Sequence, residues 1–249
     1  MALYIYKKRP VRKFPLLSTG ISFIPFICIV FGLVLITWVA YPIISFELFL
    51  SPKFASLIRP IPDEIIVQAM ENEIRVLGAE DSEENLNALD QIDYTKASNW
   101  FPQKPPEIIG SEKKEYLISI PKLKIKEARV VIGGENLEES LIHYGGTALP
   151  GDWGRAVIFG HSVLPQFFNP TNYKTIFSTL PTLDKKDQIL INFDGIIYTY
   201  EIFDLKIVPP DDISVLEQKY DSSYLSLVTC VPPGTYWKRL IVKARIKKI

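Results

Sequence analysis

A long uncharged segment near the N-terminus limits the architectures open to this chain. No charged residue occurs between Pro15 and Phe46, and Ile21–Ile44 is almost entirely apolar. A helix needs roughly 20 apolar residues to cross a bilayer. A cleaved signal peptide has an apolar core of only about 7–15 residues, followed by small residues. Because bulky Tyr41–Ile43 lies at the end of this core, we predict that residues 15–46 are a retained transmembrane anchor.

The charges on the two sides of the anchor predict its orientation. Cytoplasmic flanks of membrane spans carry an excess of Lys and Arg, and the first charge after the span is Glu47. We therefore expect residues 1–14 to be a cytoplasmic basic tail. We expect the rest of this single-pass protein to lie outside the cell membrane. The basic residues before the span are Lys7, Lys8, Arg9, Arg12 and Lys13.

Composition excludes several classes of function. The chain has 28 basic and 28 acidic residues, so no net positive charge points to nucleic acid. Its two cysteines are Cys28 and Cys230, and its two histidines are His143 and His161. They show no spacing typical of a zinc site, so we predict no metal and no cofactor. Cys28 lies inside the apolar segment and is expected to be a small packed residue, which leaves Cys230 as a free thiol.

The C-terminal half predicts an all-β domain. Short runs rich in β-branched and aromatic residues are separated by turn residues such as Asp194–Gly195, a strong hairpin signal. We predict a closed or nearly closed β-barrel of about eight strands over residues 116–249. Short helical turns are expected near Leu137–His143 and Tyr173–Leu180. The expected strands are residues 116–120, 128–134, 155–161, 188–193, 196–208, 224–230 and 239–246.

Residues 47–115 lack a sustained pattern and are predicted to form a stalk or linker. Asp63–Leu77 has apolar residues at helical spacing and is the one short helix expected there. The pair Trp100–Phe101 has two interpretations. It pins the linker to the surface of the domain, or it folds back over a groove as a lid.

Cys230 and His161 each end a strand-like run just before a loop. A thiol at such a place is held rigidly and can still meet a substrate, but a buried cysteine acting as a small apolar residue is also common. An imidazole beside it would take up its proton and later protonate a leaving amine. Gly160 would let the chain turn, or let another group approach closely, before His161. A structural role for His161 remains the alternative.

Arg239 opens the strand-like run that follows the Cys230 loop. If the two strands pair, its guanidinium returns to the thiol, where fixed donors would stabilise a developing oxyanion. A surface arginine on an edge strand is the alternative, and Lys238 and Arg245 are rivals for the role.

Together these segments resemble the sortases of bacterial cell surfaces. The resemblance rests on Phe159–His161, Ser226–Cys230 and Arg239–Val242, in that order and behind an N-terminal anchor. Residues 143–151 and 120–123 also resemble stretches found in many members. The likeness covers residues 116–246. Ser226 stands where the family usually has threonine, a change that keeps the hydroxyl.

The resemblance implies a membrane-anchored cysteine transpeptidase. Cys230 would attack a C-terminal sorting signal of a secreted protein, and an amine from a cell-wall precursor or a pilin lysine would resolve the thioacyl intermediate. His161 would act as general acid and base, and Arg239 would hold substrate and oxyanion. Thr229 and Val228 are expected to contact substrate, although Thr229 is equally a strand former. His143 is expected to be non-catalytic.

Two other functions remain open on the sequence. A non-catalytic, membrane-tethered β-barrel that binds wall polymer or a partner protein would explain the anchor and the barrel. A single-cysteine hydrolase would differ only in the second chemical step. The need for calcium is also open, since five acidic residues lie in loops without the spacing of a metal-binding loop. They are Glu135, Glu138, Glu139, Asp184 and Asp187.

Overall fold

The computed structural model describes residues 15–54, 95–100 and 115–247. The helix predicted at Asp63–Leu77 and the side chain of Phe101 lie outside the described residues. The chain divides into two compact units, Met1–Tyr41 and Pro42–Ile249. We describe each unit by itself.

The first unit contains most of α1 (Pro15–Ser45), an apolar helix over the segment predicted to be the anchor. Large apolar side chains from Phe26 onward are exposed along it. The continuous helical stretch Pro25–Phe54 is long and apolar enough to cross a membrane, with a mean hydropathy of 2.5. An apolar helix that exposes its large apolar side chains is typical of a membrane span, so α1 is a candidate span.

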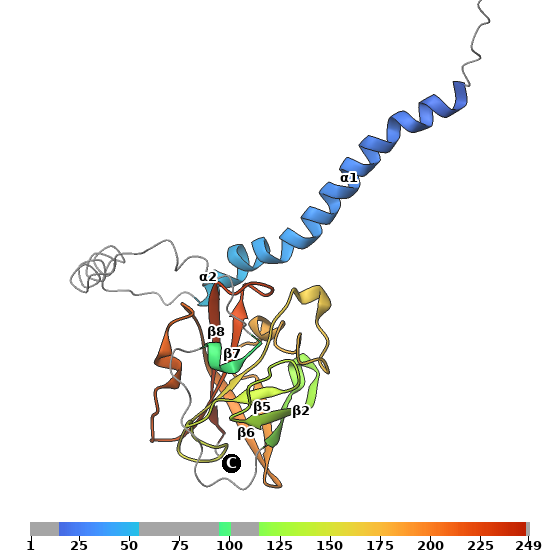
Figure 1. Ribbon diagram of the computed structural model, residues 1–249. Coiled ribbons are helices and arrows are strands. Elements are labelled where there is room, and N and C mark those ends of the chain that lie inside the picture. The colour runs from blue at the N-terminus through green and yellow to red at the C-terminus, as the bar shows by residue number, and fades with distance from the viewer. Residues whose placement is uncertain (1–14, 55–94, 101–114, 248–249) are drawn as a thin grey trace, which may run out of the picture. The chain divides into compact units, whose positions relative to one another are not determined.

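The second unit is built on a closed barrel of eight strands in the order β1-β2-β3-β4-β7-β8-β6-β5 (Figure 1). This confirms the predicted all-β barrel. The strands are β1 (Glu115–Ile120), β2 (Ile125–Ile132), β3 (Leu141–His143), β4 (Gly154–Phe159), β5 (Gln188–Phe193), β6 (Ile196–Val208), β7 (Ser223–Val231) and β8 (Lys238–Ile246).

Short helices lie before the barrel and in its connections. The first two, η1 and α2, continue directly from α1. The third, η2, is a 3₁₀ turn that precedes β1, and the others are single 3₁₀ turns between strands. They are η1 (Phe46–Leu50), α2 (Ser51–Phe54), η2 (Ala97–Trp100), η3 (Pro121–Leu123), η4 (Pro165–Phe167), η5 (Leu180–Thr182) and η6 (Ile213–Leu216).

The strand β3 is the main correction to the sequence prediction. A helical turn was expected over Leu137–His143, but Leu141–His143 is a strand that pairs parallel to β2 and antiparallel to β4. A strand of this length is too short to display alternation of apolar and polar residues. The predicted turn at Asp194–Gly195 is confirmed. Both residues have positive φ, at 54° and 77°, and they join the antiparallel strands β5 and β6.

One part of the barrel wall is buried on both faces, and this part carries the candidate site. Side chains alternate between faces along a strand, and in β7 every residue is buried. Leu225 and Leu227 belong to the large cluster that fills the barrel, whereas Val228 and Cys230 belong to a second cluster on the other face. The second cluster includes Trp100 from η2. The outer face of this wall is therefore covered by a segment that precedes the barrel in sequence.

The last residue of the predicted anchor, Phe46, and parts of the predicted stalk pack against the barrel. Phe46 and Phe54 are buried in the same cluster as the barrel interior. Glu47 approaches Lys238 at the start of β8, with 3.4 Å between carboxylate oxygen and ammonium nitrogen. Near the other end of the stalk, the Ala97 amide donates to the carbonyl of Glu135 at 2.9 Å.

Candidate active site

Cys230 and Arg239 face each other across a strand pair. β7 and β8 are antiparallel, and Cys230 is the direct partner of Arg239 in their register. Directly opposed residues in such a pair have Cβ atoms about 4.5–5.5 Å apart and point to the same face. Arg239 is only 2% exposed. The pairing expected from the sequence therefore does return this guanidinium to the neighbourhood of the thiol.

His161 approaches the end of β7 that carries Cys230 from the side on which β4 is the neighbouring strand. β4 and β7 are parallel, with Phe159 opposite Val228, and both side chains lie in the outer cluster. His161 and Cys230 each lie two residues further along their chains. Side chains two residues apart in extended chain share a face, so the imidazole and the thiol emerge on the same side of the wall.

Gly160 is required by a close approach, as the sequence suggested. A Cβ at this position would lie 2.4 Å from the Phe177 ring and 2.6 Å from the Leu141 side chain. Real Cβ atoms are not found at such distances, so any larger residue would displace the chain just before His161. The glycine thus fixes where the imidazole emerges.

A set of buried hydrogen bonds locks the His161 segment to the Cys230 strand. The Thr229 hydroxyl donates to the carbonyl of Gly160 at 2.8 Å, and the Ser162 hydroxyl donates to the carbonyl of Cys230 at 2.7 Å. On its other side, the carbonyl of His161 accepts from the Phe177 amide at 3.0 Å. Ser162 was not predicted, because a serine after a histidine gives no distinctive signal in a single sequence.

Trp100 covers this arrangement. The guanidinium carbon of Arg239 lies 4.9 Å from the centroid of the indole ring, within the range of a cation–π contact. The same ring meets His161 edge-on, with centroids 6.4 Å apart, and tilts against Phe159 at 5.5 Å. Trp100 is 2% exposed. Trp100 therefore pins its segment to the domain, as one of the two interpretations expected, and it does so against Arg239 and His161.

Burial under this cover changes the chemistry of the thiol. Cys230 is 1% exposed, and burial raises its pKa to about 11, while the positive charge of Arg239 acts in the opposite direction. A thiol is nucleophilic only as the thiolate. In this arrangement Cys230 is a neutral thiol, withdrawn from solvent.

Comparison with known proteins decides the family. The sortase domain model matches residues 118–247, which is more than half of the chain. The chain belongs to the sortase family.

Among curated proteins, this sortase is 30% identical to sortase D of Bacillus subtilis over 131 residues, covering 51% of this chain and 60% of that protein. It is 32% identical to sortase A of Streptococcus agalactiae over 75 residues, 30% of each chain. The match to each relative thus spans less than two thirds of that relative's length. The names differ in class letter, so these relatives do not assign the chain to one class of sortase.

Solved structures of two sortases are similar to this chain. A Clostridium perfringens sortase D5 transpeptidase matches at 26% identity with a TM-score of 0.47, over 68% of this chain and 90% of that one. Sortase C-1 of Actinomyces oris matches at 26% identity with a TM-score of 0.48, over 55% of this chain and 77% of that one.

The second histidine of this sortase lies apart from the thiol. His143, on β3, is fully buried, and both ring nitrogens are hydrogen-bonded. The Thr147 hydroxyl donates to the carbonyl of Tyr144 at 2.7 Å, so it accepts from Nε2 of His143, 3.0 Å away. Nδ1 then accepts from the Tyr116 hydroxyl at 2.8 Å. These contacts hold a neutral imidazole in one tautomer.

The remaining predicted site residues are the two substrate-contact candidates on β7 and the two rivals of Arg239. Thr229 and Val228 are both fully buried, and the Thr229 hydroxyl is engaged with Gly160. Neither reaches the surface in this structure. Of the rivals to Arg239, Lys238 meets Glu47, and Arg245 pairs with Tyr224 near the far end of β8.

The loop carboxylates meet cationic side chains. Lys122 donates to Asp184 at 2.6 Å and to Asp187 at 2.7 Å, and Lys174 pairs with Glu138 at 2.9 Å. Within residues 15–54, 95–100 and 115–247, no three His, Cys, Asp or Glu side chains come together in a way that could hold a metal ion.

Proposed function

We propose that this sortase is a membrane-anchored cysteine transpeptidase that acts outside the cytoplasm, with Cys230 as nucleophile, His161 as general acid and base, and Arg239 as oxyanion and substrate ligand. The observation that carries the proposal is the register of β4, β7 and β8. In this register Cys230 is paired directly with the buried Arg239, and His161 follows shortly after the end of β4, the strand on the other side of β7.

In the first half-reaction, the sulfur of Cys230 adds to the carbonyl carbon of a peptide bond in a C-terminal sorting signal. His161 receives the thiol proton and passes it to the leaving amine, so the C–N bond breaks and a thioester remains. In the second half-reaction, an amine from a cell-wall precursor or a pilin lysine attacks the thioester, gives up its proton, and releases the thiol. Arg239 stabilises the oxyanion in both steps.

The segment 95–100 acts as a lid in this proposal. With Trp100 in place, the thiol is buried and its pKa is about 11. Displacement of the indole would expose Cys230 to water and substrate, lower its pKa and free the guanidinium of Arg239. What supports this is that one side chain contacts Arg239, His161 and Phe159 together.

The test is capture of an acyl group on the full-length chain. A panel of C-terminal sorting-signal peptides is incubated with the wild-type protein and with Cys230→Ala, and the intact protein mass is measured. We expect an adduct on the wild type and none on Cys230→Ala. The matched control is Cys28→Ala, which keeps the nucleophile and should still form the adduct. Equal adducts on Cys230→Ala and wild type would reject the proposal.

The same assay separates the other functions left open by the sequence. A non-catalytic binding module would form no adduct with any peptide. A hydrolase would release the acid product at the same rate with and without added amine. A transpeptidase shifts its product to the amide as the amine concentration rises.

A further inference from the structure

A groove outside the candidate site lies between the helical segment that follows the membrane span and the barrel. Its volume is about 590 Å³. One wall is formed by Leu50 and Phe54, and the facing wall comes from η5 and the loop after it, together with β6. Leu183 and Leu205 complete an apolar floor. The groove lies entirely within the unit Pro42–Ile249.

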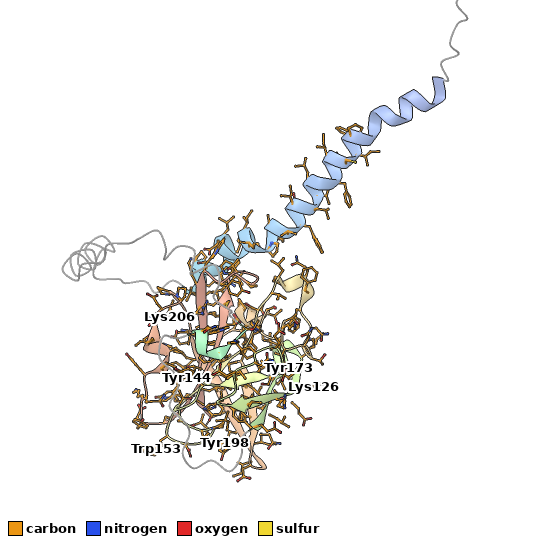
Figure 2. The ribbon with its side chains drawn as sticks, viewed as in Figure 1. Lys126, Tyr144, Trp153, Tyr173, Tyr198 and Lys206 are labelled. Atoms are coloured by element: carbon orange, nitrogen blue, oxygen red, sulfur yellow. The ribbon has the colours of Figure 1, made fainter. Side chains whose placement is uncertain are left out.

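Three lysines line this groove, and none is within ion-pairing distance of a carboxylate among the described residues. They are Lys53 from α2, Lys185 from the loop before β5, and Lys206 from β6 (labelled in Figure 2). Of the three, Lys53 acts on Asp184, whose pKa is lowered mainly by its hydrogen bond with Lys122 and least by the charge of Lys53. Within residues 15–54, 95–100 and 115–247, these three ammonium groups thus have no carboxylate in ion-pairing distance to compete with an external anion.

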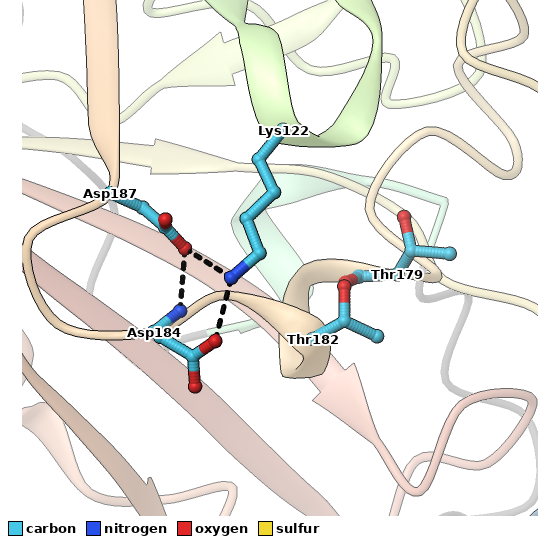
Figure 3. A network of polar contacts seen from close by, with 5 residues as sticks. All are labelled: Lys122, Thr179, Thr182, Asp184 and Asp187. Carbon is cyan, nitrogen blue, oxygen red and sulfur yellow. Dashed lines mark hydrogen bonds and ion pairs between the residues drawn. The ribbon is translucent and has the colours of Figure 1, made fainter.

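The carboxylates in the groove already have cationic partners. Asp184 and Asp187 share the ammonium group of Lys122, as Figure 3 shows. Asp204 lies 3.7 Å from the ammonium of Lys243. The groove residues and the residues that form ion pairs with them include more lysines than carboxylates. The net charge of this set is therefore positive.

The helical residues that line the groove follow the uncharged segment closely along the chain. The uncharged segment ends at Phe46, and the helical stretch Glu47–Lys53 spans at most about 9 Å at a rise of 1.5 Å per residue. The headgroup layer adds about 5–8 Å on each side of the hydrocarbon core. On the same segment, Leu48 and Phe49 are 65% and 69% exposed. Apolar side chains exposed beside a cationic groove are typical of a segment at a bilayer interface.

We propose that this groove binds the headgroup of an anionic phospholipid from the leaflet into which the chain emerges. Lys53, Lys185 and Lys206 would hold the phosphate, and Leu50 and Phe54 would contact the glycerol and the first methylenes of the acyl chains. The bound lipid would then fix the barrel against the membrane. This inference does not depend on the proposed catalytic chemistry.

The experiment uses the full-length chain in a non-ionic detergent. It is titrated with soluble dihexanoyl phosphatidylglycerol, dihexanoyl phosphatidylcholine and inorganic phosphate, and bound ligand is counted by native mass spectrometry. The test variant is the triple substitution Lys53→Gln, Lys185→Gln and Lys206→Gln. The control removes the same charge elsewhere, through Lys126→Gln, Lys174→Gln and Lys219→Gln. Lys126 and Lys206 lie well apart in Figure 2.

We expect the wild type and the control to bind phosphatidylglycerol at least tenfold more tightly than phosphatidylcholine, with the preference weakening as salt is added. The groove variant should lose at least tenfold in affinity for phosphatidylglycerol. Equal binding of the two lipids, an unaffected groove variant, or equal losses in both variants would overturn the proposal. Tight binding of phosphate alone would also overturn it, since it would indicate a site for a soluble anion.

Thermal unfolding of each variant verifies folding, and the salt dependence of the wild type tests the proposal without any substitution.

Discussion

The two histidines of this chain lie at or just after the ends of neighbouring strands of the barrel wall, yet they occupy very different surroundings. His143 ends β3, and both of its ring nitrogens are hydrogen-bonded within the barrel. His161 follows β4 and meets Trp100, beside the strand pair that carries Cys230 and Arg239. The interior histidine is covered by the barrel itself, whereas the outer one is covered by a segment that precedes the barrel.

This difference shows how one barrel wall can carry a tightly packed interior face and, on its outer face, a candidate active site. Around His143 every polar group has a fixed partner within the same sheet or its turns, so the residue contributes to stability and has no group left for substrate. Cys230 is buried in an outer cluster that includes Trp100 from η2, a segment that precedes the barrel and meets it through the hydrogen bond from the Ala97 amide to the Glu135 carbonyl. We expect removal of the indole to expose the thiol while the barrel stays closed. Four substitutions test this contrast.

The largest effect is expected for the outer histidine. His161→Ala removes the general acid and base and should lower kcat/KM in the peptide transfer assay by about 10²–10⁴-fold, with little loss of thermal stability. The comparison variant is His143→Gln, which should lower stability and leave the activity of the folded protein within a few fold. Similar activity losses in both variants would remove the functional distinction between the two histidines.

The second largest loss of activity is expected for Arg239→Lys. The lysine keeps the positive charge but lacks the forked donors, so we expect a loss of about 10²–10³-fold in kcat/KM. Arg245→Lys, on the exposed part of β8, is the matched control and should retain activity. If Arg239→Lys works as well as the wild type, directed hydrogen bonds from this position do not take part in the reaction.

The interior histidine should make folding stability depend on pH. Burial lowers the pKa of His143 from 6.5 to about 4, so the unfolded chain binds a proton more readily than the folded one between these values. The contribution of His143 to the free energy of unfolding is fully present above pH 6.5. It falls as the pH is lowered, and about 3 kcal/mol is lost at pH 4. Denaturant unfolding of wild type and His143→Gln at pH 7.5, 5.5 and 4 measures this. A difference between the two that does not change with pH would contradict it.

The smallest expected effect is an increase in the reactivity of the Cys230 thiol. Trp100→Ala should expose Cys230, so that its pKa falls from about 11 toward the ordinary value of about 8.5. We expect the rate of alkylation by a small thiol reagent at pH 8 to rise at least tenfold. Trp153→Ala, in an exposed loop (labelled in Figure 2), is the control and should leave the rate unchanged. An unchanged rate in Trp100→Ala would mean that the indole does not limit access to the thiol.

Much of the fold was predictable because its signals are local. The uncharged run 15–46 predicted the helix α1, and Asp194–Gly195 predicted a hairpin whose residues have the positive φ values that such turns require. Seven of the strands were expected near their observed positions. β3 was not, because its partners β2 and β4, rather than its own residues, define it as a strand.

The candidate site was predictable only as a set of residue types. The sequence by itself determined a candidate span, a β-barrel, and one thiol, one histidine and one arginine at strand ends. It could not determine that β7 lies between β4 and β8, that Arg239 rather than Arg245 faces Cys230, or that Trp100 lies over them. Those facts depend on contacts between residues far apart in the chain, and such contacts leave no periodicity in the sequence. The same is true of the state of the thiol, since its pKa is set by burial, which exists only once the barrel and η2 have come together.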